Sequence, residues 1–320
     1  MKKMNAAVFC GSGRIEVQRL PVPKLAAHEV AVRLEGCGVC ASNLPVWAGK
    51  PWFTYPLTPG SPGHEGWGEV ADVGADVQDF SPGDRVTFLS HKAYAEYDVA
   101  PASALIPLPK QFAGLPLPGE PLACVMNIFR RSDIQSGQHV AVIGVGFMGA
   151  LLIQLAAHAG AKVIALTRRP YALEVARLCG ATYIVPCSDM HAAIGTVMEI
   201  TQGRGCERAI EAAGEQGSLD LASALSGEGG RLIIAGYHQD GARTIDMQQW
   251  NWRGLDVINA HERDASVVVR GMREAMQAVT EGSLDPFPLL THSFPLDRLD
   301  QAFTAMRDRP DGFLKATVTL

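Results

Sequence analysis

The sequence predicts an α/β protein in which a strand-rich domain is joined to a doubly wound, parallel-sheet domain. Three observations support this prediction. The chain has 320 residues, which is more than one hydrophobic core usually holds. Its first part reads as short strands broken by turns, and after Ser136-Gly137 strands alternate with helices, as in βαβ units. We expect domains at residues 1–125 and 126–259, with residues 260–320 returning to the first domain.

In the first domain the strands are indicated by alternation and by turns. Val30 to Glu35 alternates with a period of two, which is typical of a half-exposed strand. Glu69 to Val73 and Arg85 to Leu89 are further expected strands, the second following the turn Ser81-Pro82-Gly83-Asp84. The stretch from Pro101 to Pro121 holds six prolines and two glycines, so we expect it to be largely extended or loop.

In the second domain the apolar runs are short and regularly spaced. The expected strands are Val140–Ile143, Lys162–Leu166, Ala209–Ala212 and Arg231–Ala235. The expected helices, including two beyond this domain, are Phe147–His158, Tyr171–Cys179, Ala265–Thr280 and Leu299–Arg307.

One segment could be mistaken for a membrane span. No Asp, Glu, Lys or Arg occurs from Ile134 to Ala161. Three glycines within its apolar run, and Gln154 just beyond it, argue against a helix that faces lipid. A buried strand that leads into a buried helix has the same composition, and we favour that interpretation.

Charge and cysteine content exclude two classes of partner and indicate a compartment. The net charge is −5, so the chain offers no basic field for nucleic acid and no polybasic stretch for a membrane surface. Its seven cysteines run from Cys10 to Cys206 without a pairing rhythm. An odd number of unpatterned cysteines favours thiols or metal ligands in a reducing compartment, so we expect a cytoplasmic protein.

A glycine-rich loop follows the first strand of the second domain. It matches G-x-G-x-x-G in the run Gly144-Val145-Gly146-Phe147-Met148-Gly149. The three glycines serve a tight turn, close approach of a pyrophosphate and helix–strand contact, and the helix N-terminus favours the negative charge. The motif alone is weak, but here it lies between an expected strand and an expected helix. The loop therefore predicts a Rossmann domain that binds a dinucleotide.

The end of the next strand indicates which dinucleotide is bound. NAD sites usually carry an acid there, which accepts a hydrogen bond from the ribose 2′-hydroxyl. This chain instead has Thr167-Arg168-Arg169, whose hydroxyl and guanidinium groups can hold a 2′-phosphate. We expect NADP(H) to be favoured and NAD(H) to remain possible. Arg168 is the expected phosphate partner, and Arg169 is expected to face solvent ahead of Pro170; the alternative is that both arginines simply begin a solvated turn.

Cysteine and histidine residues of the first domain have the chemistry of zinc ligands. Cys40, His64 and Cys124 offer two thiolates and an imidazole, which leaves a fourth tetrahedral position open. Their spacing does not establish a metal site, because a buried cysteine is usually a small apolar residue. The pair Cys37-x-x-Cys40 is equally compatible with a redox dithiol or half of a zinc knuckle, although no second C-x-x-C follows.

A resemblance to a known family assigns these residues a role. The run Gly63-His64-Glu65-Gly66-Trp67-Gly68, with Gly74 and Val77, fits the zinc alcohol dehydrogenase signature G-H-E-x2-G-x5-G-x2-V. The chain resembles the medium-chain dehydrogenase/reductase superfamily over essentially its whole length. The resemblance implies a GroES-like catalytic domain before the Rossmann domain and one catalytic zinc on Cys40, His64 and Cys124. No cysteine lies between Cys40 and Cys124, so the structural-zinc lobe of many relatives is missing.

The same resemblance implies the roles of three neighbouring residues. Ser42 matches the family's proton-relay hydroxyl, and Glu65 is expected to act electrostatically or as an alternate zinc partner. Asn43 stands where relatives usually have the Asp that bonds the histidine ligand. Asn43 can still accept such a bond but brings no charge.

The implied reaction is reversible hydride transfer between an alcohol or carbonyl and the nicotinamide cofactor, in an enzyme expected to be a dimer or tetramer. A zinc-free quinone or enone reductase and a tetrapyrrole-pathway dehydrogenase are alternatives of similar fold or chemistry. A nucleotide-binding sensor or structural protein is the alternative from another class.

Overall fold

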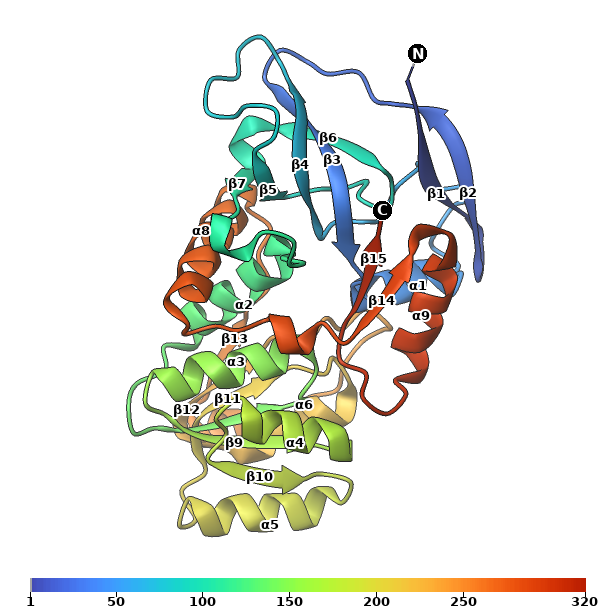
Figure 1. The fold of residues 1–320 in the computed structure, drawn as a ribbon. Helices are drawn as coiled ribbons and strands as arrows, with labels where there is room; N and C mark the ends of the chain where they lie inside the picture. Colours follow the sequence, from blue (N-terminus) through green and yellow to red (C-terminus); the bar gives the residue numbers. More distant parts are fainter. Residues whose placement is uncertain (1) are drawn as a thin grey trace. The chain divides into compact units, whose positions relative to one another are not determined.

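The structure is a computed structural model that describes residues 2–320 and divides into two compact units (Figure 1). The first unit comprises residues 1–123, 263–280 and 286–320, and the second comprises residues 124–262 and 281–285. Within the described residues, no helix has the length and apolar character that crossing a membrane requires.

The first unit is built mostly on antiparallel strands, and only β14 and β15 pair in parallel among the described strands of this unit. A hairpin pairs β1 with β2, and a seven-stranded sheet has the order β14-β15-β3-β4-β5-β7, with β6 also paired to β3. Val318 in β15 lies opposite Cys37 in β3, so the last strand of the chain belongs to this sheet. The strands are β1 (Lys3–Gly11), β2 (Arg14–Pro21), β3 (Glu29–Gly38), β4 (Gly66–Val73), β5 (Arg85–Phe88), β6 (Tyr97–Pro101), β7 (Leu105–Pro107), β14 (His292–Pro295) and β15 (Ala316–Thr319).

Helices pack around this sheet, and aromatic rings form the centre of its core. Phe303 of α9 lies edge-to-face against Phe9, with ring centroids 5.6 Å apart, and stacks on Trp47 at 5.8 Å. Such contacts stabilise a core beyond the area that they bury. The helical segments are η1 (Ala41–Asn43), α1 (Leu44–Trp47), η2 (Ala102–Ala104), η3 (Lys110–Phe112), α8 (Ala265–Glu281), η4 (Phe287–Leu289), η5 (Leu296–Arg298) and α9 (Leu299–Asp308).

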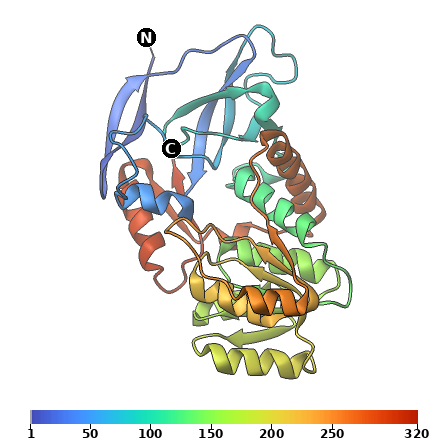
Figure 2. The ribbon, with the colours of Figure 1, turned by 180° about the vertical axis from the view of Figure 1, so that it is seen from behind.

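The second unit is a parallel sheet with the strand order β10-β9-β8-β11-β12-β13. This 3-2-1-4-5-6 arrangement is the doubly wound order of dinucleotide-binding domains, so the predicted fold class is confirmed. Helices α3 and α4 cover one face and α6 and α7 the other (Figures 1 and 2). The elements are β8 (His139–Ile143), α3 (Phe147–His158), β9 (Lys162–Thr167), α4 (Pro170–Leu178), β10 (Tyr183–Pro186), α5 (Met190–Ile200), β11 (Cys206–Glu211), α6 (Gln216–Leu225), β12 (Ser226–Ile234), α7 (Met247–Arg253) and β13 (Asp256–Asn259).

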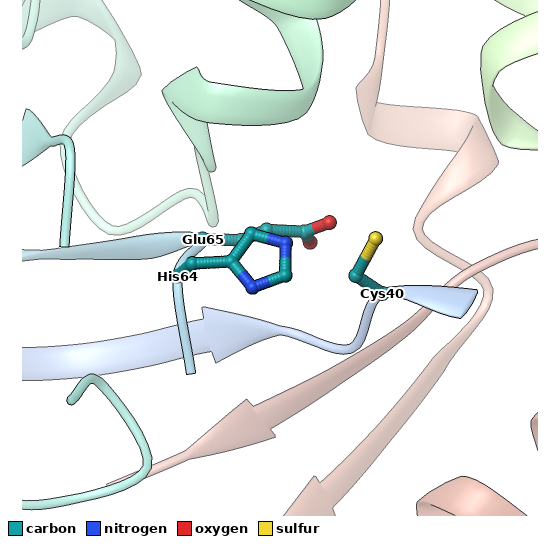
Figure 3. A group of neighbouring side chains, drawn as sticks. All are labelled: Cys40, His64 and Glu65. Atoms are coloured by element: carbon teal, nitrogen blue, oxygen red, sulfur yellow. The ribbon is translucent and has the colours of Figure 1, made fainter. Parts of the chain in front are cut away.

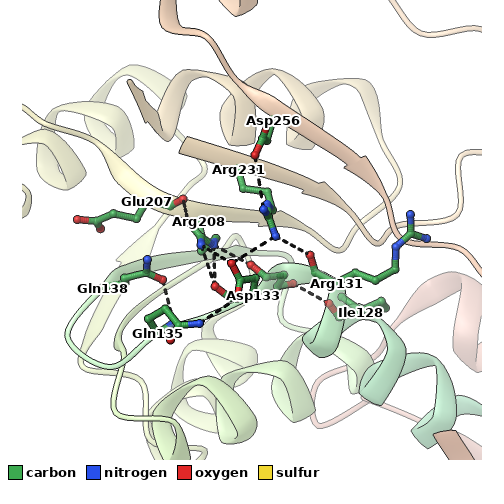
Figure 4. A network of polar contacts seen from close by, with 10 residues as sticks. Ile128, Arg131, Asp133, Gln135, Gln138, Glu207, Arg208, Arg231 and Asp256 are labelled. Carbon is green, nitrogen blue, oxygen red and sulfur yellow. Dashed lines mark hydrogen bonds and ion pairs between the residues drawn. The ribbon is translucent and has the colours of Figure 1, made fainter. Parts of the chain in front are cut away.

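Helix α2 (Gly119–Ser132) starts inside the proline-rich stretch and ends in the second unit. Arginines from two strands hold its C-terminal end (Figure 4). Arg208 of β11 donates to the carbonyls of Ser132 and Asp133 at 2.7 and 2.8 Å, and Arg231 of β12 donates to that of Arg131 at 3.2 Å. Cationic donors satisfy the carbonyls that a helix end leaves unpaired, so the sheet fixes the end of α2.

Candidate active site

The register of two antiparallel strands brings Cys40 and His64 together. Cys37 of β3 lies opposite Gly66 of β4, and the Gly38 N–H donates to the Glu65 carbonyl at 3.0 Å. Cys40 therefore follows the end of β3 at the place where His64 and Glu65 precede β4. Cys40 and His64 are 24 positions apart in the sequence. They become neighbours because the register of β3 and β4 places the loops that carry them side by side.

Cys40, His64 and Glu65 form the group of possible metal ligands found within residues 2–320. Their ligand atoms all lie within 4.8 Å of one another, and Figure 3 shows the three side chains turned toward one another. Glu65 is 1% exposed, whereas Cys40 and His64 are half-buried. A thiol, an imidazole and a carboxylate at this separation are a donor set that suits Zn²⁺.

His64 is oriented by the backbone. Its Nδ1 lies 2.9 Å from the Pro62 carbonyl oxygen, to which it donates, so Nε2 is the ring nitrogen that could bind a metal once it has lost its own proton. Burial opposes protonation of this imidazole, but the hydrogen bond and charge of Cys40, with Glu120 and Glu65, outweigh burial and raise the pKa of His64 to about 10. The surroundings therefore favour a positive charge at this place, which a divalent cation also supplies.

Asn43 makes no hydrogen bond to the histidine ring among the described residues. Its amide Nδ2 donates to the Pro62 carbonyl at 3.3 Å and to the Tyr94 hydroxyl at 3.2 Å. The Pro62 carbonyl accepts the proton of His64 Nδ1. Asn43 shares that carbonyl and supports the ring indirectly.

Glu65 has a partner that sequence reasoning missed. The Nζ of Lys315, which precedes β15, lies 2.7 Å from Oε1 and 2.6 Å from Oε2, and Lys315 is 7% exposed. Burial alone would lower the pKa of Lys315, but Glu65, Cys40 and Glu120 together raise it above its ordinary value. Lysines are almost never buried unless paired, so a lone lysine in the apolar run Phe313 to Val318 was the available signal.

The Glu65 carboxylate faces Lys315 with both of its oxygens. Oε1 accepts from Nζ at 2.7 Å, and Oε2 lies 2.6 Å from the same ammonium group. A Cβ added to Gly38 would lie 1.8 Å from this oxygen, so only glycine lets the carboxylate approach the strand. A thiol, an imidazole and a neighbouring buried carboxylate are donors of the kinds that hold a zinc ion.

Ser42 lies beside the proposed ligand Cys40. Its hydroxyl is 3.2 Å from the Cys40 sulfur, to which it can donate, and 3.4 Å from Asn43 Oδ1. Ser42 is half-buried, so the hydroxyl lies at the border of the group.

Cys124, the third predicted ligand, lies in α2 at the first residue of the second unit. It is half-buried and is outside the group formed by Cys40, His64 and Glu65. Its role as a ligand stays a prediction.

The three glycines of the second unit's loop behave as a pyrophosphate site requires. Gly144 has φ of +99°, in the region that favours glycine, and makes the turn from β8 into α3. A Cβ on Gly146 would meet nothing within 4 Å, so the backbone there is open to a ligand. A Cβ on Gly149 would lie 2.0 Å from the Gly144 carbonyl oxygen, so this glycine permits the close contact of helix and strand. Val145 and Phe147 are buried and Met148 is half-buried.

The residues after β9 do not all lie where the sequence led us to expect. Thr167 is buried, and its hydroxyl accepts from the Arg169 N–H at 3.4 Å. Arg169 is half-buried and donates to the Val145 carbonyl at 3.3 Å, so the expectation that it faces solvent was wrong. The loop carbonyl attracts its guanidinium. Arg168 is exposed and pairs with Glu215, at 3.2 Å.

Comparisons with known proteins agree with this arrangement. Residues 26–110 match the alcohol dehydrogenase GroES-like domain, and residues 148–282 match the zinc-binding dehydrogenase family. L-threonine 3-dehydrogenase of Chromobacterium violaceum is 25% identical over 340 residues, covering 93% of this chain and 94% of that protein.

Two solved structures are similar over both chains. A putative zinc-binding dehydrogenase of Sinorhizobium meliloti 1021, bound to NADP, is 26% identical with a TM-score of 0.83 and 100% coverage of each chain. The 2R,3R-butanediol dehydrogenase of Bacillus subtilis is 25% identical with a TM-score of 0.84 and 99% coverage of each. This chain belongs to the zinc-dehydrogenase family of the medium-chain dehydrogenase/reductase superfamily.

Proposed function

We propose that this protein is a zinc-dependent oxidoreductase that interconverts an alcohol and a carbonyl compound with a nicotinamide cofactor. The observation that carries the proposal is the meeting of Cys40, His64 and Glu65 within 4.8 Å, with His64 oriented by the Pro62 carbonyl. Cys40, His64 and Cys124 would hold one zinc ion, and Glu65 would be its alternate partner. A zinc-free reductase of this fold has no need for a thiol, an imidazole and a carboxylate in one place.

Two residues of the chain, Ser42 and Lys315, would support the reaction around the metal. Bound zinc supplies a Lewis acid, which lowers the pKa of a hydroxyl group that reaches it. The Ser42 hydroxyl would accept the alcohol proton and pass it on, since it lies at the border of the group beside Cys40. Lys315 compensates the charge of Glu65, so the buried carboxylate does not stand uncompensated beside the thiolate.

The second unit would bind the cofactor in an extended manner across its glycine loop. The open backbone at Gly146 would receive the pyrophosphate, and the residues after β9 would receive the adenosine ribose. No acid follows β9, and the Arg169 guanidinium lies against the loop at Val145. We therefore propose that NADP(H) is favoured over NAD(H), with Arg169 as well as Arg168 available to a 2′-phosphate.

For the substrate, we propose a small secondary alcohol with a neighbouring polar group. Threonine and 2,3-butanediol, named for two relatives, share a secondary hydroxyl next to a carbon that carries an amine or a hydroxyl. A screen should therefore begin with diols and hydroxy amino acids, and continue with simple alcohols, polyols and aldehydes.

The test measures cofactor reduction or oxidation with this panel and with both cofactors. We expect turnover with at least one alcohol or carbonyl, and a kcat/KM for NADP(H) above that for NAD(H). Thr167→Asp should lower the NADP-to-NAD ratio by about ten- to hundredfold, because a charge-assisted contact is worth about 1.5–3 kcal/mol and the new carboxylate repels the phosphate. Absence of turnover in zinc-loaded protein would contradict the proposed activity, and better use of NAD by the wild type would contradict the cofactor preference.

A further inference from the structure

We propose that Glu215 determines cofactor specificity by holding Arg168 and so limiting the preference for a 2′-phosphate. This inference rests on the proposed cofactor site at residues 144–149 and 167–169. Glu215 supplies, from a different helix, the carboxylate that is missing after β9.

The topology of the sheet places Glu215 at the edge where the cofactor would bind. Strand β8 leads into the glycine loop, with β9 paired on one side and β11 on the other. All three strands are parallel, so the residues that follow them lie at one carboxyl edge. Arg168 follows β9, and Glu215 follows β11 as the N-cap of α6.

The two side chains meet across this edge. Arg168 Nη2 lies 3.2 Å from Glu215 Oε2, although the residues are 47 positions apart. Both side chains are more than half exposed, at 65% and 54%. Exposed ion pairs are weak, so Arg168 can be drawn to another anion when one arrives.

The turn that carries Glu215, by contrast, is fixed in place. The Ser218 hydroxyl accepts from the Glu215 N–H at 3.2 Å, across the first turn of α6. Glu211 anchors this turn, because its fully buried carboxylate lies 2.6 Å from the Ser218 hydroxyl. The backbone of Glu215 therefore keeps its carboxylate at this edge of the sheet.

Glu211 itself is held from several sides. Oε1 accepts from the backbone N–H groups of Ala213 and Gly214 at 2.8 and 2.7 Å, and Oε2 lies 2.9 Å from His238 Nε2. The other nitrogen of that ring accepts from Arg243 Nε at 2.8 Å, so the imidazole is neutral and donates to Glu211. The turn that carries Glu215 therefore rests on a hydrogen-bonded network centred on the buried Glu211 carboxylate, which makes the turn rigid.

A fixed carboxylate at this place acts on the two cofactors differently. A 2′-phosphate would have to compete with Glu215 for Arg168 and would also be repelled by the carboxylate. A 2′-hydroxyl meets neither penalty and can donate to a carboxylate, as it does in sites that select NAD. Glu215 should therefore favour NAD and weaken the preference that the two arginines create.

The experiment compares two nucleotide fragments by calorimetry, without catalysis. Adenosine 2′,5′-bisphosphate carries the 2′-phosphate and 5′-AMP lacks it. In Glu215→Gln, which keeps the size of the side chain and removes its charge, we expect the ratio of the two dissociation constants to shift by about tenfold toward the bisphosphate. In an Arg168→Ala background the same change should shift the ratio less than it does with Arg168 present, because only the direct repulsion by the carboxylate is then relieved.

Glu174→Gln is the matched control, because it breaks another exposed ion pair, with Arg177 on α4, and should leave the ratio unchanged. If Glu215→Gln is poorly folded, Glu215→Ser replaces it with a preferred N-cap residue that has no charge. An unchanged ratio in folded variants that still bind 5′-AMP overturns the role of Glu215 alone. Failure of the wild type to bind either fragment overturns the proposed cofactor site and this inference with it.

Discussion

An ion pair lies at the group of possible metal ligands in the first unit, and another lies at the carboxyl end of β9 in the second unit, but the two pairs differ in burial. Glu65 and Lys315 have side chains that are 1% and 8% exposed, whereas those of Glu215 and Arg168 are 54% and 65% exposed. A buried charge without its partner is costly, while an exposed pair contributes little. The buried pair can therefore keep the side chains around it in a fixed geometry. The exposed pair can only shift the preference between NADP(H) and NAD(H) by a small free energy.

The largest expected effect comes from removing one of the proposed zinc ligands Cys40 and His64. His64→Ala and Cys40→Ser should lose zinc and lower kcat/KM by at least about a thousandfold, because a Lewis acid supplies several kcal/mol of transition-state stabilisation. Turnover with the best substrate and zinc content per chain measure the two effects. Cys10→Ser is the control, since Cys10 is also half-buried but is outside the group. Retention of zinc and turnover in both ligand variants would contradict the proposed site.

Ser42→Ala should come next. Loss of a general acid–base group lowers the rate of the chemical step by about 10²–10⁴-fold, while cofactor binding should be unaffected. The measurement is kcat with the ordinary substrate and with substrate deuterated at the carbon that loses the hydride. A difference between the two shows that hydride transfer limits the rate. Ser42→Thr keeps the hydroxyl and should restore most of the activity. If Ser42→Ala turns over at the wild-type rate, another group carries the proton.

The buried ion pair should matter for stability far more than exposed pairs do. Lys315→Met leaves the Glu65 carboxylate buried and uncompensated, so we expect a loss of about 3–5 kcal/mol in the free energy of unfolding. Denaturant unfolding of chelator-treated protein measures it. Arg177→Met, which breaks the exposed pair with Glu174, should change stability by less than about 1 kcal/mol. Adding Glu65→Gln to Lys315→Met should recover part of the lost free energy of unfolding. Equal losses in Lys315→Met and Arg177→Met would contradict the distinction between the buried and the exposed pair.

The smallest effect is a pH dependence. The pKa of His64 is raised to about 10 in the absence of metal, so the stability that this proton contributes is fully present below about pH 6.5. It is lost as the pH rises through 10. A metal must displace the same proton, so the apparent zinc affinity should rise by about tenfold per unit between pH 7 and 9. Competition with a chromogenic chelator measures this slope, and a flat profile would show that His64 is not protonated in the metal-free protein.

The sequence predicted the features that depend on neighbours in the chain. The parallel sheet and the glycine loop are set by local periodicity and by three glycines within six residues, and the fold class was confirmed. The contacts of charged side chains were not predictable in this way. Lys315 reaches Glu65 across 250 residues, and Glu215 reaches Arg168 across 47, and both depend on which strands lie side by side.

Sequence reasoning failed where a local rule met a competing partner. Arg169 was expected in solvent, but the Val145 carbonyl draws it to the loop. The stretch from residue 101 to 121 is largely extended or loop as expected, and α2 begins only at Gly119 near its end. Proline is tolerated in the first turn of a helix, so Pro121 does not prevent this start.

Metal analysis of the purified, zinc-supplemented wild type tests the central claim most directly. We propose one zinc per chain, because one group contains Cys40 and His64 and no cysteine lies between Cys40 and Cys124 to form a structural-zinc lobe. We predict a stoichiometry of one by elemental analysis, falling to zero in His64→Ala. Two zincs per chain, or none in the supplemented wild type, would contradict the account.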